Sequence, residues 1–288
     1  MVGLGWQGQH RAERAPESAF QRVAASRCLH KTRGRCTLWA MRESQVIIER
    51  VRRVSADIQQ IDLTAQQPLM QLRPGQSLFA RPAIPNGWTP YLREQWIPVD
   101  ILPGRVVVEL PTGASLAPGE LANVLSPVGR PIPLRPNIQR LLLIAEDAMP
   151  TPFALLARAL SSGGVAVTLV LGGRATDYPL ELLSPEIEIL HSSTDWKWPD
   201  QVETLNWADQ VIVLAPTLSQ AAVYSRLYET ISQLRHHDIP DNFVCGLFYP
   251  RLACGEGACD SCLVAAQKKD LLACTDGPAI DLKKVNFL

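Results

Sequence analysis

Residues 253–278 read ACGEGACDSCLVAAQKKDLLACTDGP, and the cysteines in this stretch decide how the rest of the chain is interpreted. They follow the spacing C-x4-C-x2-C-x11-C and are Cys254, Cys259, Cys262 and Cys274. This is the ligand spacing of a plant-type [2Fe-2S] cluster, in which three thiolates close together in sequence are joined by a fourth from a returning segment. We therefore predict that these four cysteines are the ligands of a [2Fe-2S] cluster.

The residues between the cysteines suit a loop that wraps a cluster. Gly255 and Gly257 permit the positive φ angles that a tight loop needs. Ala258 and Ser261 are small, so backbone N–H groups can approach the sulfur atoms and tune the potential of the cluster through hydrogen bonds.

A zinc-stabilised interaction module is the alternative interpretation, because four cysteines with a C-x2-C pair also suit tetrahedral Zn²⁺. Zinc ribbons usually pair two C-x2–4-C knuckles, whereas the second half of this motif offers a single cysteine. A disulfide framework fits less well, since the chain has an odd number of cysteines, seven, and no apolar signal segment. The cysteines outside the motif are read as buried or incidental thiols; they are Cys28, Cys36 and Cys245.

The run CGEGACDSCLV, followed by ACTDGP, resembles the cluster-binding tail of the electron transfer subunit of type B dihydroorotate dehydrogenase, in the ferredoxin-NADP reductase-like superfamily. The tail of that family reads approximately C-G-x-G-A-C-x-x-C and then C-x-D-G-P, and every fixed position is present here. The resemblance implies that the four cysteines are the cluster ligands. It also implies that the other fixed residues shape the loop; they are Gly255, Gly257, Asp276, Gly277 and Pro278.

The same resemblance implies a function. Members of the family carry FAD in a β-barrel domain and a cluster in the tail, and they relay electrons between NAD(H) and a partner subunit that contains FMN. For this chain it implies an electron-transfer subunit in a hetero-oligomer with a flavoprotein catalytic subunit such as dihydroorotate dehydrogenase. A cluster-only carrier or docking subunit that has lost FAD and NAD is the alternative.

Composition limits the remaining function classes. The chain has 288 residues, of which 47% are hydrophobic and 19% charged, so it can bury one large or two modest cores. Its formal net charge of zero argues against a nucleic-acid partner. No run approaches the roughly 18 apolar residues of a membrane-spanning helix, so we expect a soluble protein. Cluster chemistry without an export signal predicts a cytoplasmic location.

The fold class predicted from the pattern along the chain is a ferredoxin-reductase-like antiparallel barrel, a doubly wound parallel sheet and a short cluster-binding tail. Residues 43–136 show short β-branched runs separated by Pro-Gly pairs and predict the barrel, of the type that binds FAD. Residues 137–244 alternate apolar runs with helical segments and predict a nucleotide-binding-like α/β domain. Residues 245–288 form the tail.

Residues 1–42 differ from the rest and are predicted to be a disordered extension. The first forty hold seven Lys or Arg and show no sustained periodicity. An Arg-rich transit peptide is the alternative, but Glu13 and Glu17 weaken it because such peptides are poor in acidic residues.

The flavin motif of the resembled family is altered in this chain. That motif reads R-x-[YF]-[ST], with arginine on the FAD pyrophosphate and the hydroxyl near the flavin ring; the matching stretch here is LREQWIPV, residues 92–99. Arg93 could still reach a phosphate and Trp96 could stack on the flavin, so these are the candidate FAD-binding residues. Packing in the core or at an interface is the alternative for Trp96, as it is for Trp88 and Tyr91. Ile97 or Pro98 replaces the hydroxyl residue, and a proline removes an amide donor as well.

The nicotinamide motif is altered further. In the family the first strand of the α/β domain ends in a turn close to G-G-G-x-G-x-x-P, whose glycines allow close approach to phosphates. Here that turn reads EDAMPTP, residues 146–152, and its two carboxylates would repel a pyrophosphate. Gly172-Gly173-Arg174, after the next strand, offers either an anion site or, as we expect, a plain turn. Direct use of NAD(P)H by this chain is therefore not expected, and no residue is predicted to be catalytic.

Overall fold

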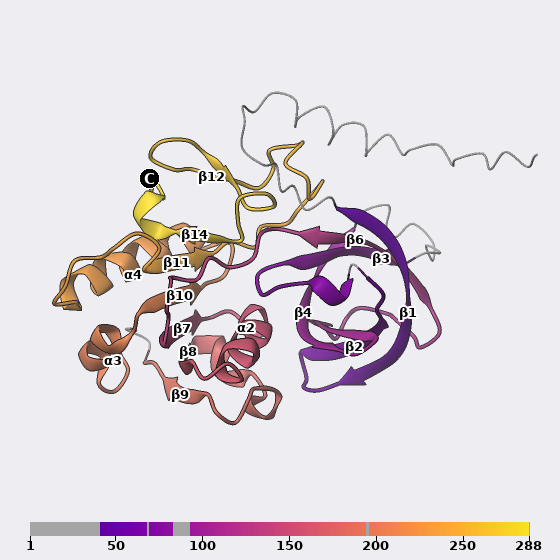
Figure 1. The fold of residues 1–288 in the computed structure, drawn as a ribbon, viewed down its shortest axis with the longest axis horizontal. Coiled ribbons are helices and arrows are strands. Elements are labelled where there is room, and N and C mark those ends of the chain that lie inside the picture. The colour runs from indigo at the N-terminus through magenta and orange to yellow at the C-terminus, as the bar shows by residue number, and fades with distance from the viewer. Residues whose placement is uncertain (1–40, 68, 83–92, 194–195, 288) are drawn as a thin grey trace, which may run out of the picture. The chain divides into compact units, whose positions relative to one another are not determined.

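The computed structural model describes residues 41–67, 69–82, 93–193 and 196–287 (Figure 1). The predicted extension over residues 1–42 lies outside them, apart from its last two residues. None of the helices in these four ranges is long and apolar enough to cross a membrane.

The first half of the described chain is a closed antiparallel barrel, as predicted. Its strands follow the order β1-β2-β5-β4-β3-β6 around the barrel. Their bounds are β1 (Arg42–Arg53), β2 (Ile58–Thr64), β3 (Ser77–Pro82), β4 (Glu94–Leu102), β5 (Arg105–Pro111) and β6 (Leu121–Val128), with a short 3₁₀ turn η1 (Leu69–Gln71). The Pro-Gly pairs lie between these elements, and Gly75, Gly104 and Gly119 all have positive φ, which explains the glycine at each turn.

The second half is a six-stranded sheet in the order β14-β11-β10-β7-β8-β9, in which only the β14–β11 pair is antiparallel. The elements are β7 (Arg140–Glu146), α2 (Thr151–Ser161), β8 (Ala166–Gly172), η2 (Gly173–Asp177), η3 (Leu180–Leu182), β9 (Glu188–His191), α3 (Gln201–Trp207), β10 (Gln210–Leu214), α4 (Gln220–Leu234) and β11 (Val244–Leu247).

Both faces of this sheet are covered, which is why its central strands are apolar throughout. Leu141 and Leu143 of β7 belong to the same core cluster as Phe153 of α2. Leu142, one residue along, belongs instead to the cluster that contains Tyr224 of α4. Alternate side chains of one strand therefore pack on helices at opposite faces, as in a doubly wound sheet.

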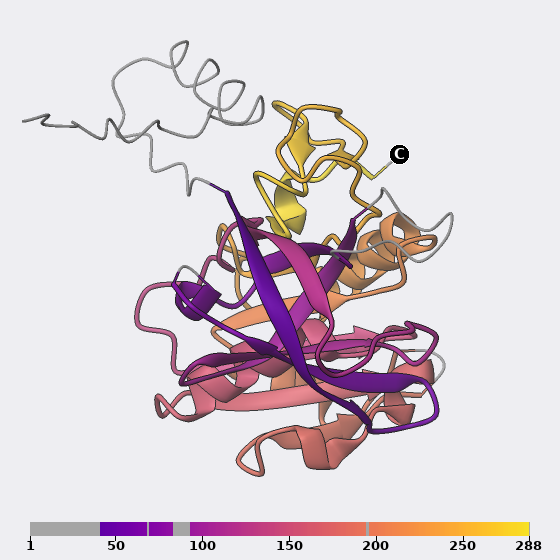
Figure 2. The same ribbon diagram turned by 90° about the vertical axis from the view of Figure 1, so that its right-hand side faces the viewer.

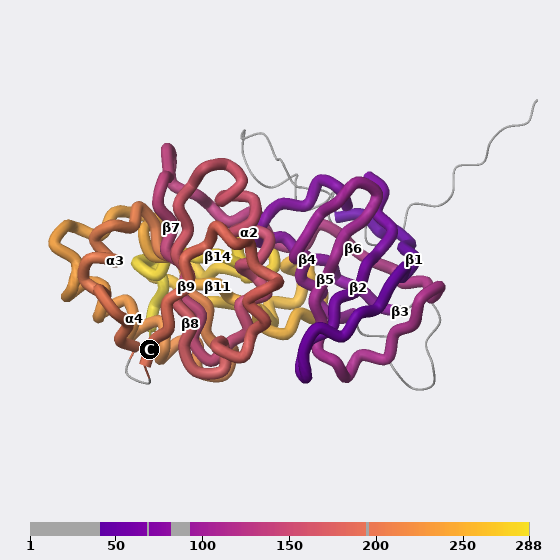
Figure 3. Tube along the Cα trace, turned by 90° about the horizontal axis from the view of Figure 1, so that it is seen from below, coloured from indigo at the N-terminus to yellow at the C-terminus, as the bar shows by residue number. Residues whose placement is uncertain are grey.

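The order of the parallel strands creates a switch point between β7 and β10. The chain runs from β7 to β8 and β9 on one side, and then returns to place β10 on the other side of β7. In open α/β sheets ligands bind at such a point, outside the carboxyl ends of the strands. Helix α2, which follows β7, packs against barrel strand β4, and Ala154 shares a small core cluster with Val99 and Val107 (Figure 3).

The tail begins in the sheet and returns to it near its end. Strand β14 (Ala279–Asp281) pairs antiparallel with β11, so the segment between them is a long excursion between neighbouring strands. This excursion contains β12 (Leu263–Val264) and β13 (Leu271–Leu272), and η4 (Leu282–Lys284) follows β14. Figures 1 and 2 show it, in yellow, projecting beyond the sheet. The predicted start of the tail, residue 245, falls inside β11.

Candidate metal centre and adjoining cleft

The four predicted ligand cysteines come together in the tail as two pairs. The Sγ atoms of Cys254 and Cys259 are 3.3 Å apart, and those of Cys262 and Cys274 are 3.2 Å apart. Both pairs are free thiols, as is Cys245. Each iron of a [2Fe-2S] cluster with four cysteine ligands takes two thiolates, so one pair for each iron fits such a centre.

The backbone of the loop points its amides at these sulfur atoms. Gly255 and Gly257 have φ of 72° and 71°, the left-handed region expected from the sequence. The N–H groups of Glu256 and Ala258 donate to Cys254 Sγ, with N···S distances of 3.4 and 3.3 Å. The Gly257 N–H donates to Sγ of the last cysteine at 3.1 Å. The loop therefore supplies the amide hydrogen bonds that stabilise charge on a bound cluster.

The two pairs differ in burial. Cys262 and Cys274 are 3% and 4% exposed and belong to a core cluster that also contains Phe79 of the barrel. Cys259 is exposed, and Ser261 Oγ lies 3.1 Å from its Sγ. Hydrogen bonds from Ser261, first from its side chain, and from Cys254 lower the pKa of Cys259 to about 7, whereas burial raises the pKa of Cys274. One side of the site thus faces the interior and the other faces solvent.

The loop is fixed to the end of barrel strand β6. The Gly129 N–H donates to the carbonyl oxygen of Cys274 at 3.1 Å, and the Arg130 N–H donates to the Gly277 oxygen at 2.6 Å. The Arg130 guanidinium also donates to the Thr275 oxygen at 2.6 Å. The returning cysteine is therefore held by the barrel as well as by its own loop.

In the described part of the chain, no group of three or more His, Cys, Asp or Glu side chains is already arranged around one ion. A structural zinc site needs four ligands around one point, whereas each iron of a two-iron centre takes a pair of thiolates.

A cavity of about 490 Å³ lies where the barrel meets the switch point of the sheet. Its volume is within the range of small-molecule sites. It is lined from the barrel side by Arg93, Gln95 and Ile97, from the α2 side by Ala148, Met149 and Pro152, after β10 by residues 214–217, and after β11 by residues 249–252. The last of these segments ends two residues before Cys254, so this cleft and the cysteine loop adjoin in the sequence.

Arg93, a candidate FAD ligand, reaches the cleft but is already engaged. Its guanidinium pairs with Glu43 at 2.6 Å, and donates to the carbonyl oxygens of Asn123 at 2.9 Å and Phe79 at 3.4 Å. Only 13% of its side chain is exposed. A pyrophosphate would have to displace these partners to bind here.

Trp96, the other candidate, lies in the barrel interior, which differs from the expected stacking position. It is 2% exposed, belongs to the barrel core and does not line the cleft. Side chains alternate along a strand, so Arg93, Gln95 and Ile97 face the cleft while Trp96 faces inward. Gln95, which donates to Ser77 Oγ at 2.8 Å, therefore lies in the cleft where an aromatic ring was expected.

The turn after β7 is filled by its own carboxylates. Glu146 is 6% exposed and accepts a hydrogen bond from Ser192 Oγ at 3.2 Å. Its Oε2 lies directly over Gly172, because a Cβ added to that glycine would be only 1.7 Å from it. Asp147 Oδ1 accepts the N–H of Arg174 at 3.2 Å. Burial raises the pKa of Glu146. The glycine turn after β8 thus makes room for the buried Glu146 and for the exposed Asp147.

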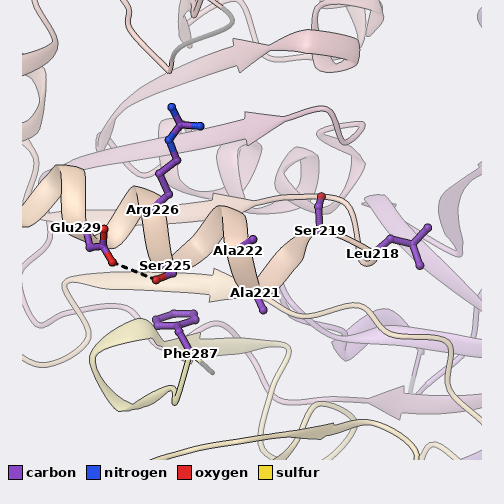
Figure 4. Close-up of a pocket in the computed structure, with 8 residues that line it drawn as sticks. All are labelled: Leu218, Ser219, Ala221, Ala222, Ser225, Arg226, Glu229 and Phe287. Carbon is purple, nitrogen blue, oxygen red and sulfur yellow. Dashed lines mark hydrogen bonds between the residues drawn. The ribbon is translucent and has the colours of Figure 1, made fainter.

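A second cavity, also of about 490 Å³, runs along the outer face of α4 (Figure 4). Ser225 and Glu229 line it and are hydrogen-bonded at 3.3 Å, and Phe287 closes one side. Its lining includes none of the residues that the sequence predicts for a site.

Several solved structures with a similar fold are redox enzymes of one architecture. An NADH-dependent reduced ferredoxin-NADP oxidoreductase matches with a TM-score of 0.64 and 18% identity over 85% of this chain and 90% of its own. The ferredoxin reductase of carbazole 1,9a-dioxygenase matches at 0.53 and 15%, over 72% and 69%. The cytochrome b5 reductase domain of Ulva prolifera nitrate reductase matches at 0.51 and 14%, over 70% and 96%. The chain therefore has a ferredoxin-reductase-like fold.

The tail gives the more specific match. Residues 250–286 match the family described as the iron-sulfur cluster binding domain of dihydroorotate dehydrogenase B. Comparison with curated proteins gives no match. The resemblance to the electron transfer subunit of type B dihydroorotate dehydrogenase is confirmed by this domain together with the fold.

Proposed function

We propose that this chain is an electron-transfer subunit that relays electrons through a [2Fe-2S] cluster to or from a flavoprotein partner. The observation that carries the proposal is the pairing of the thiols, with Cys254 beside Cys259 and Cys262 beside Cys274. Bound there, the cluster would supply one-electron redox chemistry. The protein would supply four thiolates, the amide hydrogen bonds of the loop and a fixed orientation against the barrel.

The partner we propose is a flavoprotein catalytic subunit, such as the FMN-containing dihydroorotate dehydrogenase of pyrimidine biosynthesis. The tail match supports this choice, because the family of that domain is described by dihydroorotate dehydrogenase B. The exposed side of the site, at Cys259, is the side that a partner can approach. Because the cysteine ligands must stay reduced until a cluster is inserted, we also propose a cytoplasmic location.

The described residues fit the flavin ring of FAD better than its pyrophosphate. The cleft has room for a flavin ring, and Gln95 and Ile97 would face it. Arg93 is not free to anchor the pyrophosphate, because it is bound to Glu43 and to two carbonyl oxygens, whereas the exposed Arg251 also lines the cleft. The engagement of Arg93 favours a second candidate function, a cluster-only carrier in which the barrel and sheet serve for docking.

Metal and flavin analysis of anaerobically purified protein tests both candidates. We expect iron and sulfide in equal amounts, about two of each per chain, and no stoichiometric zinc. Stoichiometric FAD would favour the complete relay over the cluster-only carrier. Zinc alone, from cells grown with ample iron, would refute both.

The ligand assignment has a matched control. Cys259→Ser should lose most of the iron and the visible absorbance, because one of the four thiolates is removed. Cys245→Ser changes a buried thiol of strand β11, outside the loop, and should leave both unchanged. Equal spectra for Cys259→Ser and the parent protein would remove Cys259 from the ligand set.

A further inference from the structure

The sheet end that follows β7 is where a parallel α/β domain normally binds an anion. The positive end of a helix dipole and free N–H groups meet there, at the start of the helix that follows the strand. In this chain that helix is α2, which begins at Thr151 beside the switch point.

Two side chains of the turn fill the space above the next strand. A Cβ on Gly172 would lie 1.7 Å from Glu146 Oε2, and a Cβ on Gly173 would lie 1.9 Å from Asp147 Oδ1. Asp147 has φ of 50°, and its carboxylate accepts the N–H of Arg174 at 3.2 Å. The chain therefore binds its own carboxylate with a turn that could otherwise bind an external anion.

A third carboxylate reaches the first turn of α2 from the barrel. Glu109 of β5 is 5% exposed, and its Oε2 accepts the Thr151 hydroxyl at 2.7 Å. The Tyr178 hydroxyl donates to the same carboxylate at 2.9 and 3.1 Å, and Gln60 Nε2 donates at 2.9 Å. Side chains of the same chain supply all of these donors. The Glu109 carboxylate is therefore held at this helix end by the fold itself.

We propose that Asp147, Glu109 and Glu146 make the sheet end after β7 selective against nicotinamide dinucleotides, so that the electron donor of this chain is another redox carrier. The buried Glu146 and the exposed Asp147 lie over Gly172 and Gly173, in the space that a phosphate bound at this turn would need. Asp147 and Glu109 place negative charge where a pyrophosphate would bring more, and like charges at such distances repel. The inference rests on the proposed electron-transfer function and specifies its partners.

The test uses the cluster-loaded full chain under anaerobic conditions. NADH and NADPH are added to about 1 mM, the upper end of ordinary Michaelis constants, and binding is followed by calorimetry and by the shift in Tm. We expect no saturable heat, no rise in Tm and no bleaching of the visible spectrum, whereas dithionite bleaches it. Saturable binding of either dinucleotide would overturn the inference. Absence of a cluster, or of bleaching by dithionite, would instead refute the proposed function.

A charge-neutral variant tests the role of the carboxylates directly. Asp147→Asn removes one like charge and should raise the affinity for inorganic pyrophosphate about tenfold, measured by calorimetry. Asp200→Asn is the matched control, because Asp200 is exposed, has φ of 53° and precedes helix α3. No gain for Asp147→Asn over Asp200→Asn would overturn the assignment.

Discussion

The carboxylate of Glu109 joins the barrel to the α/β half, and its removal should be costly. Three donors use it: the Tyr178 hydroxyl, the Gln60 amide and the Thr151 hydroxyl. Tyr178 is 2% exposed and Gln60 is 7% exposed, so neither donor finds water easily once the carboxylate is gone. Each buried unsatisfied donor costs about 1–3 kcal/mol, while Thr151 is partly exposed. We predict that Glu109→Ala lowers the free energy of unfolding by about 3–5 kcal/mol.

The assay is urea unfolding of the cluster-loaded protein, followed by far-ultraviolet circular dichroism under anaerobic conditions. Tyr178→Phe removes one donor and keeps the carboxylate satisfied by the other two, so it should cost about 1–2 kcal/mol. In the Glu109→Ala background the same change should cost at least about 1 kcal/mol less, because the hydroxyl has already lost its acceptor. A Glu109→Ala cost below about 1 kcal/mol, or strictly additive effects, would refute this reasoning.

Three further changes test the turn after β7 and the cysteine loop. Gly172→Ala should destabilise the protein by about 1–3 kcal/mol through its clashes with Glu146 and Ser192, and much less in a background that carries both Glu146→Ala and Ser192→Ala; equal costs in the two backgrounds would contradict these contacts. Burial raises the pKa of Glu146 above 4.5, so the folded state keeps a proton that the unfolded chain has lost, and stability falls as pH rises from 4.5 through the folded pKa. Glu146→Gln should flatten that part of the pH–stability curve, and an unchanged slope would argue against the buried carboxyl. Gly257→Ala should speed the loss of the cluster to a chelator, because the new Cβ would lie 2.9 Å from Thr275 Cγ2. Gly104→Ala is the control and should not, because Gly104 also has a positive φ, 75°, but nothing lies within 4 Å of its Cβ position. Equal rates of cluster loss would show that packing at the loop is unimportant.

The main architecture was predictable because its signals are local. Pro-Gly turns between β-branched runs marked the barrel, and apolar strands alternating with helical segments marked the parallel sheet. The closing strand β14 was not predictable in this way, because a three-residue strand has no periodicity of its own. Its place beside β11 depends on where the cysteine loop returns, which is a long-range property of the fold.

The candidate site was predictable to a similar degree. The spacing of the cysteines identified them as a group, but the division into two pairs needed the folded loop. For Trp96, residue type suggested a stacking ring, whereas the two-residue period of strand β4 turns it into the core and turns Gln95 outward. Glu109 carries no signal in the sequence, because its partners Thr151 and Tyr178 come from the other half of the chain.

The most direct test of the central claim is electron paramagnetic resonance of the dithionite-reduced protein, with spins and iron counted on the same sample. A [2Fe-2S] cluster that accepts one electron predicts one unpaired electron for every two irons, and no such signal before reduction. An iron-free protein, or one with no signal after reduction, would contradict an electron-transfer role for this chain.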